Sequence, residues 1–126
     1  MIKRIRPLWA TVMIVFAVLL FGMSIQLVGQ RPAVAVDGDD IGGVVTGSRG
    51  PEAGVWVIAE TTNLPTKFTR IVVTDDEGRY LLPDLPKASY SVWVRGYGLV
   101  DSAKVQSEPG KVLNLTAVAA PNAKAA

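Results

Sequence analysis

The residue types that most often carry catalysis are scarce in this chain. Histidine and cysteine are both absent, which removes the commonest general base and the thiol nucleophile. The sequence also lacks a Gly-x-Ser-x-Gly elbow and a phosphate-cradling glycine loop. The carboxylates of Glu60, Asp84 and Asp101 have no spacing that pairs them for acid–base chemistry. We therefore predict that the protein is not an enzyme and that it uses no cofactor.

One run of carboxylates could in principle hold a metal ion. Asp75, Asp76 and Glu77 are consecutive, and carboxylate oxygens are preferred ligands of calcium. Three consecutive side chains do not converge readily on one ion, and Gly78 follows them directly, as is typical of a tight turn. The pattern favours a solvated turn, so we predict no metal ligand here.

Strand alternation divides the apolar side chains between two faces of a sheet. Residues 55–60 and 90–95 are rich in β-branched and aromatic side chains and are predicted to be strands. Every second residue of a strand shares a face. The face assigned to the core carries Val55, Val57, Ala59, Tyr90, Val92 and Val94.

The opposite face of these two strands is a candidate binding surface. It carries Trp56 and Ile58 on one strand, and Trp93 and Arg95 on the other. Rigid aromatic side chains dominate the energetics of many protein interfaces, and they also stack on sugar rings. Three interpretations stay open: the tryptophans bind a protein partner, they bind a carbohydrate, or they only cover the sheet or pack on a further domain.

The elements that must position these residues are short strands separated by glycine- and proline-rich turns. Strands are expected at 41–46, 55–60, 69–74, 79–82, 90–95, 102–106 and 112–118. The segment from Gly47 to Gly54 contains three glycines and a proline, so it is predicted to be a turn. Seven short strands without helical periodicity predict an all-β fold, specifically a seven-stranded Greek-key β-sandwich.

The stretch TDDEGRYLLPDLPKASY, from Thr74 to Tyr90, is the most informative part of the predicted domain. Asp75 and Gly78 are expected to form a hairpin turn, and Tyr80 lies in the strand that follows. Pro83 ends that strand, because proline has no backbone N–H for the ladder. The turn is predicted to have a structural role and no chemical one.

At this stretch the chain resembles the carboxypeptidase regulatory-like domains. The resemblance covers residues 41–118 and rests on IGGVVTG, AGVWVIAE, TDDEGRY, LPKASYSVWV and the glycine-bracketed Tyr97. The chain departs from the family at Ala88 and Ser89, where a glycine is usual. The resemblance implies a small transthyretin-like (Ig-like) β-sandwich without catalytic residues, which often forms the N-terminal exported module of a larger bacterial-type protein.

The N-terminus predicts a targeting segment. Residues 1–7 carry three positive charges, residues 8–28 are uncharged and strongly apolar, and Ala33-Val34-Ala35 forms an A-x-A pattern suited to cleavage. This uncharged run of 21 residues, interrupted only by Thr11, Gly22, Ser24 and Gln26, would also form a helix long enough to span a bilayer. Residues 1–35 are therefore a signal peptide or a membrane anchor. Either one exports the domain, which is then periplasmic, secreted or anchored outside the cytoplasm at the inner membrane.

The charge distribution gives no support for nucleic-acid binding. Four of the 13 basic residues precede Asp37, whereas all 11 acidic residues lie at or after it, so the remainder is slightly acidic. Residues 36–40 are expected to be an acidic linker and residues 119–126 an alanine-rich tail. Membrane contact is expected only through residues 8–28.

These expectations define two hypotheses about function. The first is an exported, non-catalytic accessory module that binds a protein partner or acts as a spacer for further domains. The alternative is a carbohydrate-binding module that uses Trp56 and Trp93.

Overall fold

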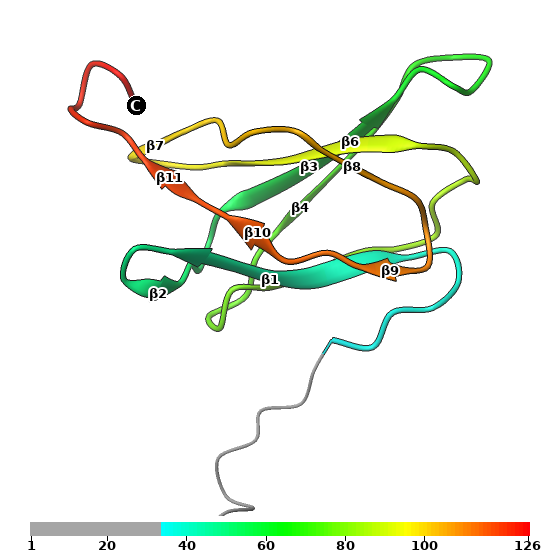
Figure 1. Ribbon diagram of the computed structural model, residues 1–126, viewed down its shortest axis with the longest axis horizontal. Helices are drawn as coiled ribbons and strands as arrows, with labels where there is room; N and C mark the ends of the chain where they lie inside the picture. The colour runs from blue at the N-terminus through cyan, green and yellow to red at the C-terminus, as the bar shows by residue number, and fades with distance from the viewer. Residues whose placement is uncertain (1–33) are drawn as a thin grey trace, which may run out of the picture. The chain divides into compact units, whose positions relative to one another are not determined.

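The computed structural model describes residues 34–126, which form two stacked layers of β-strands (Figure 1). Every regular element in this part of the chain is a strand, so the prediction of an all-β fold is confirmed. None of the described elements is a helix long and apolar enough to cross a membrane. The hydrophobic helix predicted at 8–28, and Ala33 of the predicted cleavage site, lie outside the described residues.

One layer is a four-stranded antiparallel sheet. Its strands lie in the order β4 (Phe68–Val73), β3 (Trp56–Thr61), β6 (Tyr90–Arg95) and β8 (Val105–Ser107). The central pair β3 and β6 is in register from Trp56 opposite Arg95 to Glu60 opposite Ser91. Consequently β4 and β8 are the two edges of this sheet.

The other layer is built around β1 (Ile41–Gly47). The strands β5 (Arg79–Leu82) and β2 (Gly50–Pro51) pair with it antiparallel, and β9 (Lys111–Val112) and β10 (Leu115–Thr116) pair with it parallel. At one end of the sandwich, β7 (Leu99–Val100) and β11 (Val118–Ala119) form a separate two-stranded ribbon.

The described residues form eleven strands where the sequence pattern predicted seven. Two of the four additional strands are β2, which lies in the segment 47–54 predicted to be only a turn, and β7, which follows Gly98; the other two arise because the predicted strand 112–118 is interrupted. Leu113 donates its N–H to the carbonyl oxygen of Gly42, but the next N–H of β1, that of Val44, donates to the side-chain oxygen of Asn114 at 3.0 Å. A side chain therefore replaces a backbone acceptor in the ladder. This substitution separates β9 from β10.

The side chains predicted to face the core do lie between the two layers. The residues assigned inward on β3 and β6 are all buried, and Val57, Val92 and Val94 have no exposed surface. They pack against Ile41, Val45, Tyr80 and Leu82 from the other layer, and Leu85 and Leu115 complete the cluster. All of these core residues lie between 41 and 117, so the unit that begins at Ala33 holds its own hydrophobic core.

Gly43 allows two segments of the second layer to approach closely. A Cβ at this position would collide with the carbonyl group of Leu113. That carbonyl accepts a hydrogen bond from the hydroxyl of Tyr80, whose ring is buried opposite Gly43. Burial raises the pKa of the Tyr80 phenol. Gly43 is therefore a packing residue of the second layer.

The turn at 75–79 is held by a dense set of hydrogen bonds. Asp75 accepts the N–H of Gly78 with its carbonyl, and its carboxylate accepts the N–H groups of Glu77 and Arg79 at 2.9 Å each. The other carboxylate oxygen accepts Arg79 Nε–H at 2.8 Å. Hydrogen bonds from Arg79 lower the pKa of Asp75, and the bond from its backbone N–H has a larger effect than the bond from its side chain. Gly78 has the expected positive φ, +74°.

This turn is not a hairpin, which corrects the prediction. The strand before it, β4, pairs with β3, and the strand after it, β5, pairs with β1 in the other layer. The turn therefore connects the two layers. Gly78 accepts the N–H of Val45 with its own carbonyl. A Cβ on Gly78 would lie 2.6 Å from the carbonyl oxygen of Val45, so the turn is fastened directly onto β1.

Candidate binding surface on the outer sheet face

The outer face of the four-stranded sheet carries a contiguous apolar patch. Trp56 lies opposite Val73 of β4, and Ile58 lies between Ile71 of β4 and Trp93 of β6. Because side chains of paired residues project to the same side of a sheet, these five side chains are neighbours. We call this set, Trp56, Ile58, Ile71, Val73 and Trp93, the outer patch.

Three members of the outer patch are open to solvent. Trp56 is 47% exposed, Ile71 50% and Val73 57%. Ile58 and Trp93 are 3% and 5% exposed and form the buried floor beside them. Contiguous exposed apolar side chains are unusual on small soluble domains and mark interaction sites.

Trp93 departs from the prediction of two outward, accessible tryptophans. It lies on the outer face as its strand phase requires, but it is covered there. The ammonium of Lys104 lies 4.4 Å from the centre of its ring, in a cation–π arrangement. Within the described part of the chain, the buried Nε1–H of Trp93 meets no hydrogen-bond acceptor. Of the two tryptophans only Trp56 offers an accessible ring.

Ion pairs flank the outer patch. Arg95 binds the carboxylate of Asp101 through two N–H groups, at 2.8 and 2.7 Å. The guanidinium of Arg95 lowers the pKa of Asp101. On the far side, Lys67 pairs with Glu60 at 3.3 Å. Arg95, predicted as part of the binding surface, is thus exposed but already paired, as is common at a polar rim.

Two residues of the outer patch, Ile71 and Val73, were missed from the sequence. The run Ile71-Val72-Val73 is apolar at every position, so the run alone does not show which side chains face the core. The neighbours Thr69 and Arg70 are both polar and lie on opposite faces, so only the register with β3 shows which side chains face the core. Val72 then faces inward and is partly buried against the core.

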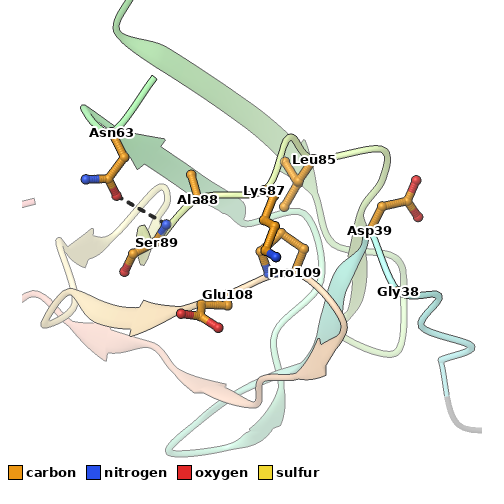
Figure 2. Close-up of a pocket in the computed structure, with 9 residues that line it drawn as sticks. All are labelled: Gly38, Asp39, Asn63, Leu85, Lys87, Ala88, Ser89, Glu108 and Pro109. Carbon is orange, nitrogen blue, oxygen red and sulfur yellow. Dashed lines mark hydrogen bonds between the residues drawn. The ribbon is translucent and has the colours of Figure 1, made fainter. Parts of the chain in front are cut away.

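A hollow lies at the end of the sandwich where β6 begins (Figure 2). It has a volume of about 750 Å³ and an apolar wall made by Leu85, Ala88 and Pro109. Lys87 and Glu108 supply charges of opposite sign at its rim. The side-chain oxygen of Asn63 accepts the N–H of Ser89 at 3.2 Å and fixes one side of the hollow. The sequence pattern did not predict this pocket.

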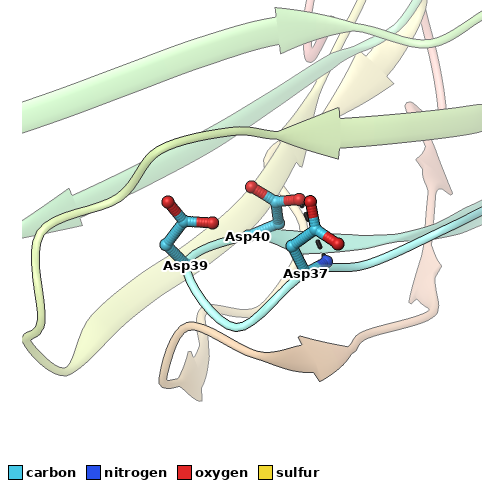
Figure 3. A group of neighbouring side chains, drawn as sticks. All are labelled: Asp37, Asp39 and Asp40. Atoms are coloured by element: carbon cyan, nitrogen blue, oxygen red, sulfur yellow. Dashed lines mark hydrogen bonds between the residues drawn. The ribbon is translucent and has the colours of Figure 1, made fainter.

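The predicted acidic linker is anchored to the domain in part. Asp40 is 5% exposed, and its carboxylate accepts the N–H groups of Asp37 and Asp84. The carboxylates of Asp37, Asp39 and Asp40 come within 4.8 Å of one another (Figure 3). Loss of some hydration at this exposed carboxylate, together with the charges of Asp40 and Asp84, raises the pKa of Asp39. The cluster serves mainly to fasten this segment to the loop that follows β5.

Comparison with known proteins shows only a likeness of fold. No protein-family model matches the chain, and no curated protein matches it. Among solved structures, the chain is similar to the crystal structure of catechol 1,2-dioxygenase from Pseudomonas arvilla C-1, with a TM-score of 0.50 and 14% sequence identity. The match covers 77% of this chain and 56% of the dioxygenase chain, just over half of that protein.

This comparison contradicts the prediction that the chain is not an enzyme, because the matching fold belongs to an enzyme. The prediction rested on missing residue types and on an accessory family, and neither ground excludes a catalytic role in a fold that also occurs in a dioxygenase. At 14% identity the likeness concerns the fold alone. It assigns no reaction to this chain.

Proposed function

We propose that this protein is an exported β-sandwich module that binds a protein partner, or a further domain, through the outer patch. The observation that carries the proposal is the exposure of Trp56, Ile71 and Val73 side by side on a rigid sheet. Such an arrangement has the anatomy of a binding hot spot, in which an aromatic anchor is surrounded by aliphatic side chains and rimmed by charged groups.

The composition of the patch favours a protein over a carbohydrate. A sugar site pairs an accessible ring with hydrogen-bonding groups that are free to reach the hydroxyls. Beside Trp56, the side chain of Arg95 is already bound to Asp101, and the remaining neighbour is Val73. Trp93, the second ring in the carbohydrate hypothesis, lies beneath Lys104. A carbohydrate remains the alternative because Trp56 by itself is an accessible platform.

The finer features of the proposal follow from the sequence. The resemblance to carboxypeptidase regulatory-like domains supports a Greek-key, transthyretin-like topology and an accessory role beside other domains or subunits. The charged, apolar and A-x-A segments before Val36 support export. Cleavage after Ala35 would begin the mature protein at Val36, and an intact mass retaining residues 1–35 in the membrane fraction would favour the anchor.

Site-specific photo-crosslinking tests the outer patch in the producing cells. A benzoylphenylalanine at position 56 replaces one aromatic residue with another on the patch. The matched control is position 97, because Tyr97 is fully exposed and lies in the loop after β6. We expect a discrete adduct with another protein from position 56 and none from position 97.

The same adduct must depend on the neighbouring patch residues. Changing Val73 to Ser should reduce its yield several-fold, because truncating a residue at a hot spot costs about 2 kcal/mol. Identical adducts from positions 56 and 97, or none from position 56, would contradict the proposal. A glycan array probed with the wild type and with Trp56→Ser decides whether the alternative applies.

A further inference from the structure

The edge strand β4 is unusually open for a strand at the side of a sheet. It is six residues long, contains neither proline nor glycine, and exposes Thr69, Ile71 and Val73. Its one charged residue, Arg70, donates to the carbonyl of Pro83 at 2.9 Å. Edge strands are commonly shortened, charged or covered, since an uncovered edge pairs with other chains. The opposite edge, β8, has only three residues. Among the described residues, no strand pairs with the free side of β4.

The backbone groups on this free side can be assigned from the ladder. The N–H of Thr74 bonds to the carbonyl of Val55, on the β3 side. Because antiparallel strands bond through alternate residues, Val72 and Arg70 also bond toward β3. The N–H and C=O groups of Val73, Ile71 and Thr69 therefore face the free edge. This is an ordered row of donors and acceptors beside the outer patch.

The two ends of β4 carry opposite charges. Lys67 precedes the strand; its ammonium lies 3.3 Å from the carboxylate of Glu60 on β3, and its side chain is still 66% exposed. The acidic turn of Asp75, Asp76 and Glu77 follows the strand, and Asp76 is exposed. An identical strand that runs antiparallel to β4, with Ile71 on the two-fold axis, places Lys67 opposite position 75 of the other copy. The carboxylate of Asp75 is bound to Arg79, so the exposed Asp76 beside it is the carboxylate that Lys67 meets. Both ends of such a pair are then complementary in charge.

We propose that β4 is a self-association edge, on which a second copy of this chain pairs antiparallel about Ile71. The pairing joins two four-stranded sheets into one continuous sheet and places the two outer patches side by side. The two-fold arrangement is isologous, so it closes as a dimer and leaves no further β4 edge exposed. The inference goes beyond the proposed function, because it concerns the edge of the sheet and not the face that binds another protein.

Disulfide trapping on the full chain tests this geometry. The chain has no cysteine, so Ile71→Cys introduces a single thiol. Hydrogen-bonded antiparallel pairs have Cα atoms about 5.5 Å apart, within reach of a disulfide. The matched control is Val105→Cys, a half-exposed valine on the opposite edge of the same sheet. After mild oxidation we expect a covalent dimer from position 71, with at least about fivefold higher yield than from position 105.

A charge exchange tests the orientation of the two strands. In the Ile71→Cys background, Lys67→Glu should lower the yield of covalent dimer about threefold to tenfold, because each dimer loses two complementary contacts. Adding Asp76→Lys to the same chain should recover part of the yield, because it places one positive charge in the turn of each copy beside the new carboxylate at position 67 of the other copy. Such recovery supports the antiparallel arrangement. A double variant that stays low overturns it.

Two other outcomes would overturn the self-association edge. Equal cross-linking at positions 71 and 105 would indicate random collision, and a disulfide to another protein would identify a foreign strand as the occupant.

The outer patch is tested separately, because Trp56→Ser in the Ile71→Cys background should leave the covalent dimer unchanged. Failure of the proposed function would remove the photo-adduct at position 56 without affecting this dimer.

Discussion

The two faces of the sheet β4-β3-β6-β8 both carry apolar side chains, but they are covered to different extents by the described chain. On the inner face, Val57, Val92 and Val94 are completely buried against the second layer. On the outer face, Trp56, Ile71 and Val73 are about half exposed. A strand with apolar residues on both faces is typical of a sheet that is covered on both sides. The part of the second side around Trp56, Ile71 and Val73 has no cover in the described residues, which is the main argument for a partner.

Trp93 shows that side-chain exposure is not uniform across the outer face. It occupies the same face as Trp56, yet Lys104 and its sheet neighbours reduce its exposure to 5%. The long aliphatic stem of a lysine can cover apolar surface while its ammonium stays in water. One half of the outer face is therefore closed by this chain itself, and the half around Trp56 is open.

The largest difference in stability between the two faces is expected when a single charged residue is placed on one face or on the other. Val94→Asp buries an unpaired carboxylate in the core and should abolish folding, with a loss of about 4 kcal/mol or more. Val73→Asp places the same group on the exposed side and should cost less than about 1 kcal/mol. Far-UV circular dichroism and urea unfolding measure both. Similar losses in the two variants would mean that Val73 is also covered.

Replacing each of the two tryptophans should give the next largest difference in the free energy of unfolding. Trp93→Ala removes a buried ring and should destabilise the domain by about 3 kcal/mol, the lower end for buried aromatic residues, because only one layer of side chains covers it. Trp56→Ala should cost about 1 kcal/mol or less, as for other surface changes. Thermal melts of both variants test this. Equal losses would show that the lysine cover is unimportant.

The turn at 75–79 is a contrasting region, in which nearly every polar group has a partner. Gly78→Val and Gly98→Val both force a β-branched residue to a φ of +74°. A Cβ at Gly98 has no heavy atom within 4 Å, whereas one at Gly78 meets the carbonyl of Val45. We expect a loss of about 1–2 kcal/mol at Gly98 and at least about 2 kcal/mol at Gly78. A smaller loss at Gly78 would contradict the fastening of the turn to β1.

A smaller effect should appear in the dependence of stability on pH. The folded-state pKa of Asp75 lies below the ordinary value of 3.8, so the unfolded chain binds its proton more readily. This contribution to stability is present above about pH 4 and is lost as the pH falls through the lowered pKa. Melting temperatures measured from about pH 6 down to about pH 2 should therefore fall less in Asp75→Asn than in the wild type. Identical profiles would contradict the prediction.

Much of the fold could be predicted from local pattern, because alternation and turn chemistry act over a few residues. The inward positions Tyr90, Val92 and Val94 and the positive φ of Gly78 are of this kind. Which strands pair could not be predicted as securely. The turn after Asp75 has the composition of a hairpin, yet it connects two layers, because β5 pairs with β1 over a separation that no local signal encodes.

The candidate site was predicted less completely, because exposure depends on what lies above a side chain. Trp93 and Trp56 have the same phase in the sheet, and the burial of Trp93 depends on Lys104, which precedes β8. Asp40 was assigned to a free linker, but its carboxylate binds the backbone of Asp84 across 44 residues. Contacts of this range become visible only in the assembled sandwich.

The most direct test of the open outer patch is acrylamide quenching of single-tryptophan chains. The chain has three tryptophans, so replacing Trp9 and one of the other two with Phe leaves either Trp56 or Trp93 as the only emitter. We expect the quenching constant of Trp56 to be several-fold larger than that of Trp93, with Trp93 becoming accessible in Lys104→Ala. Equal, weak quenching of both tryptophans would mean that the chain covers its own outer face, and it would contradict the proposed binding surface.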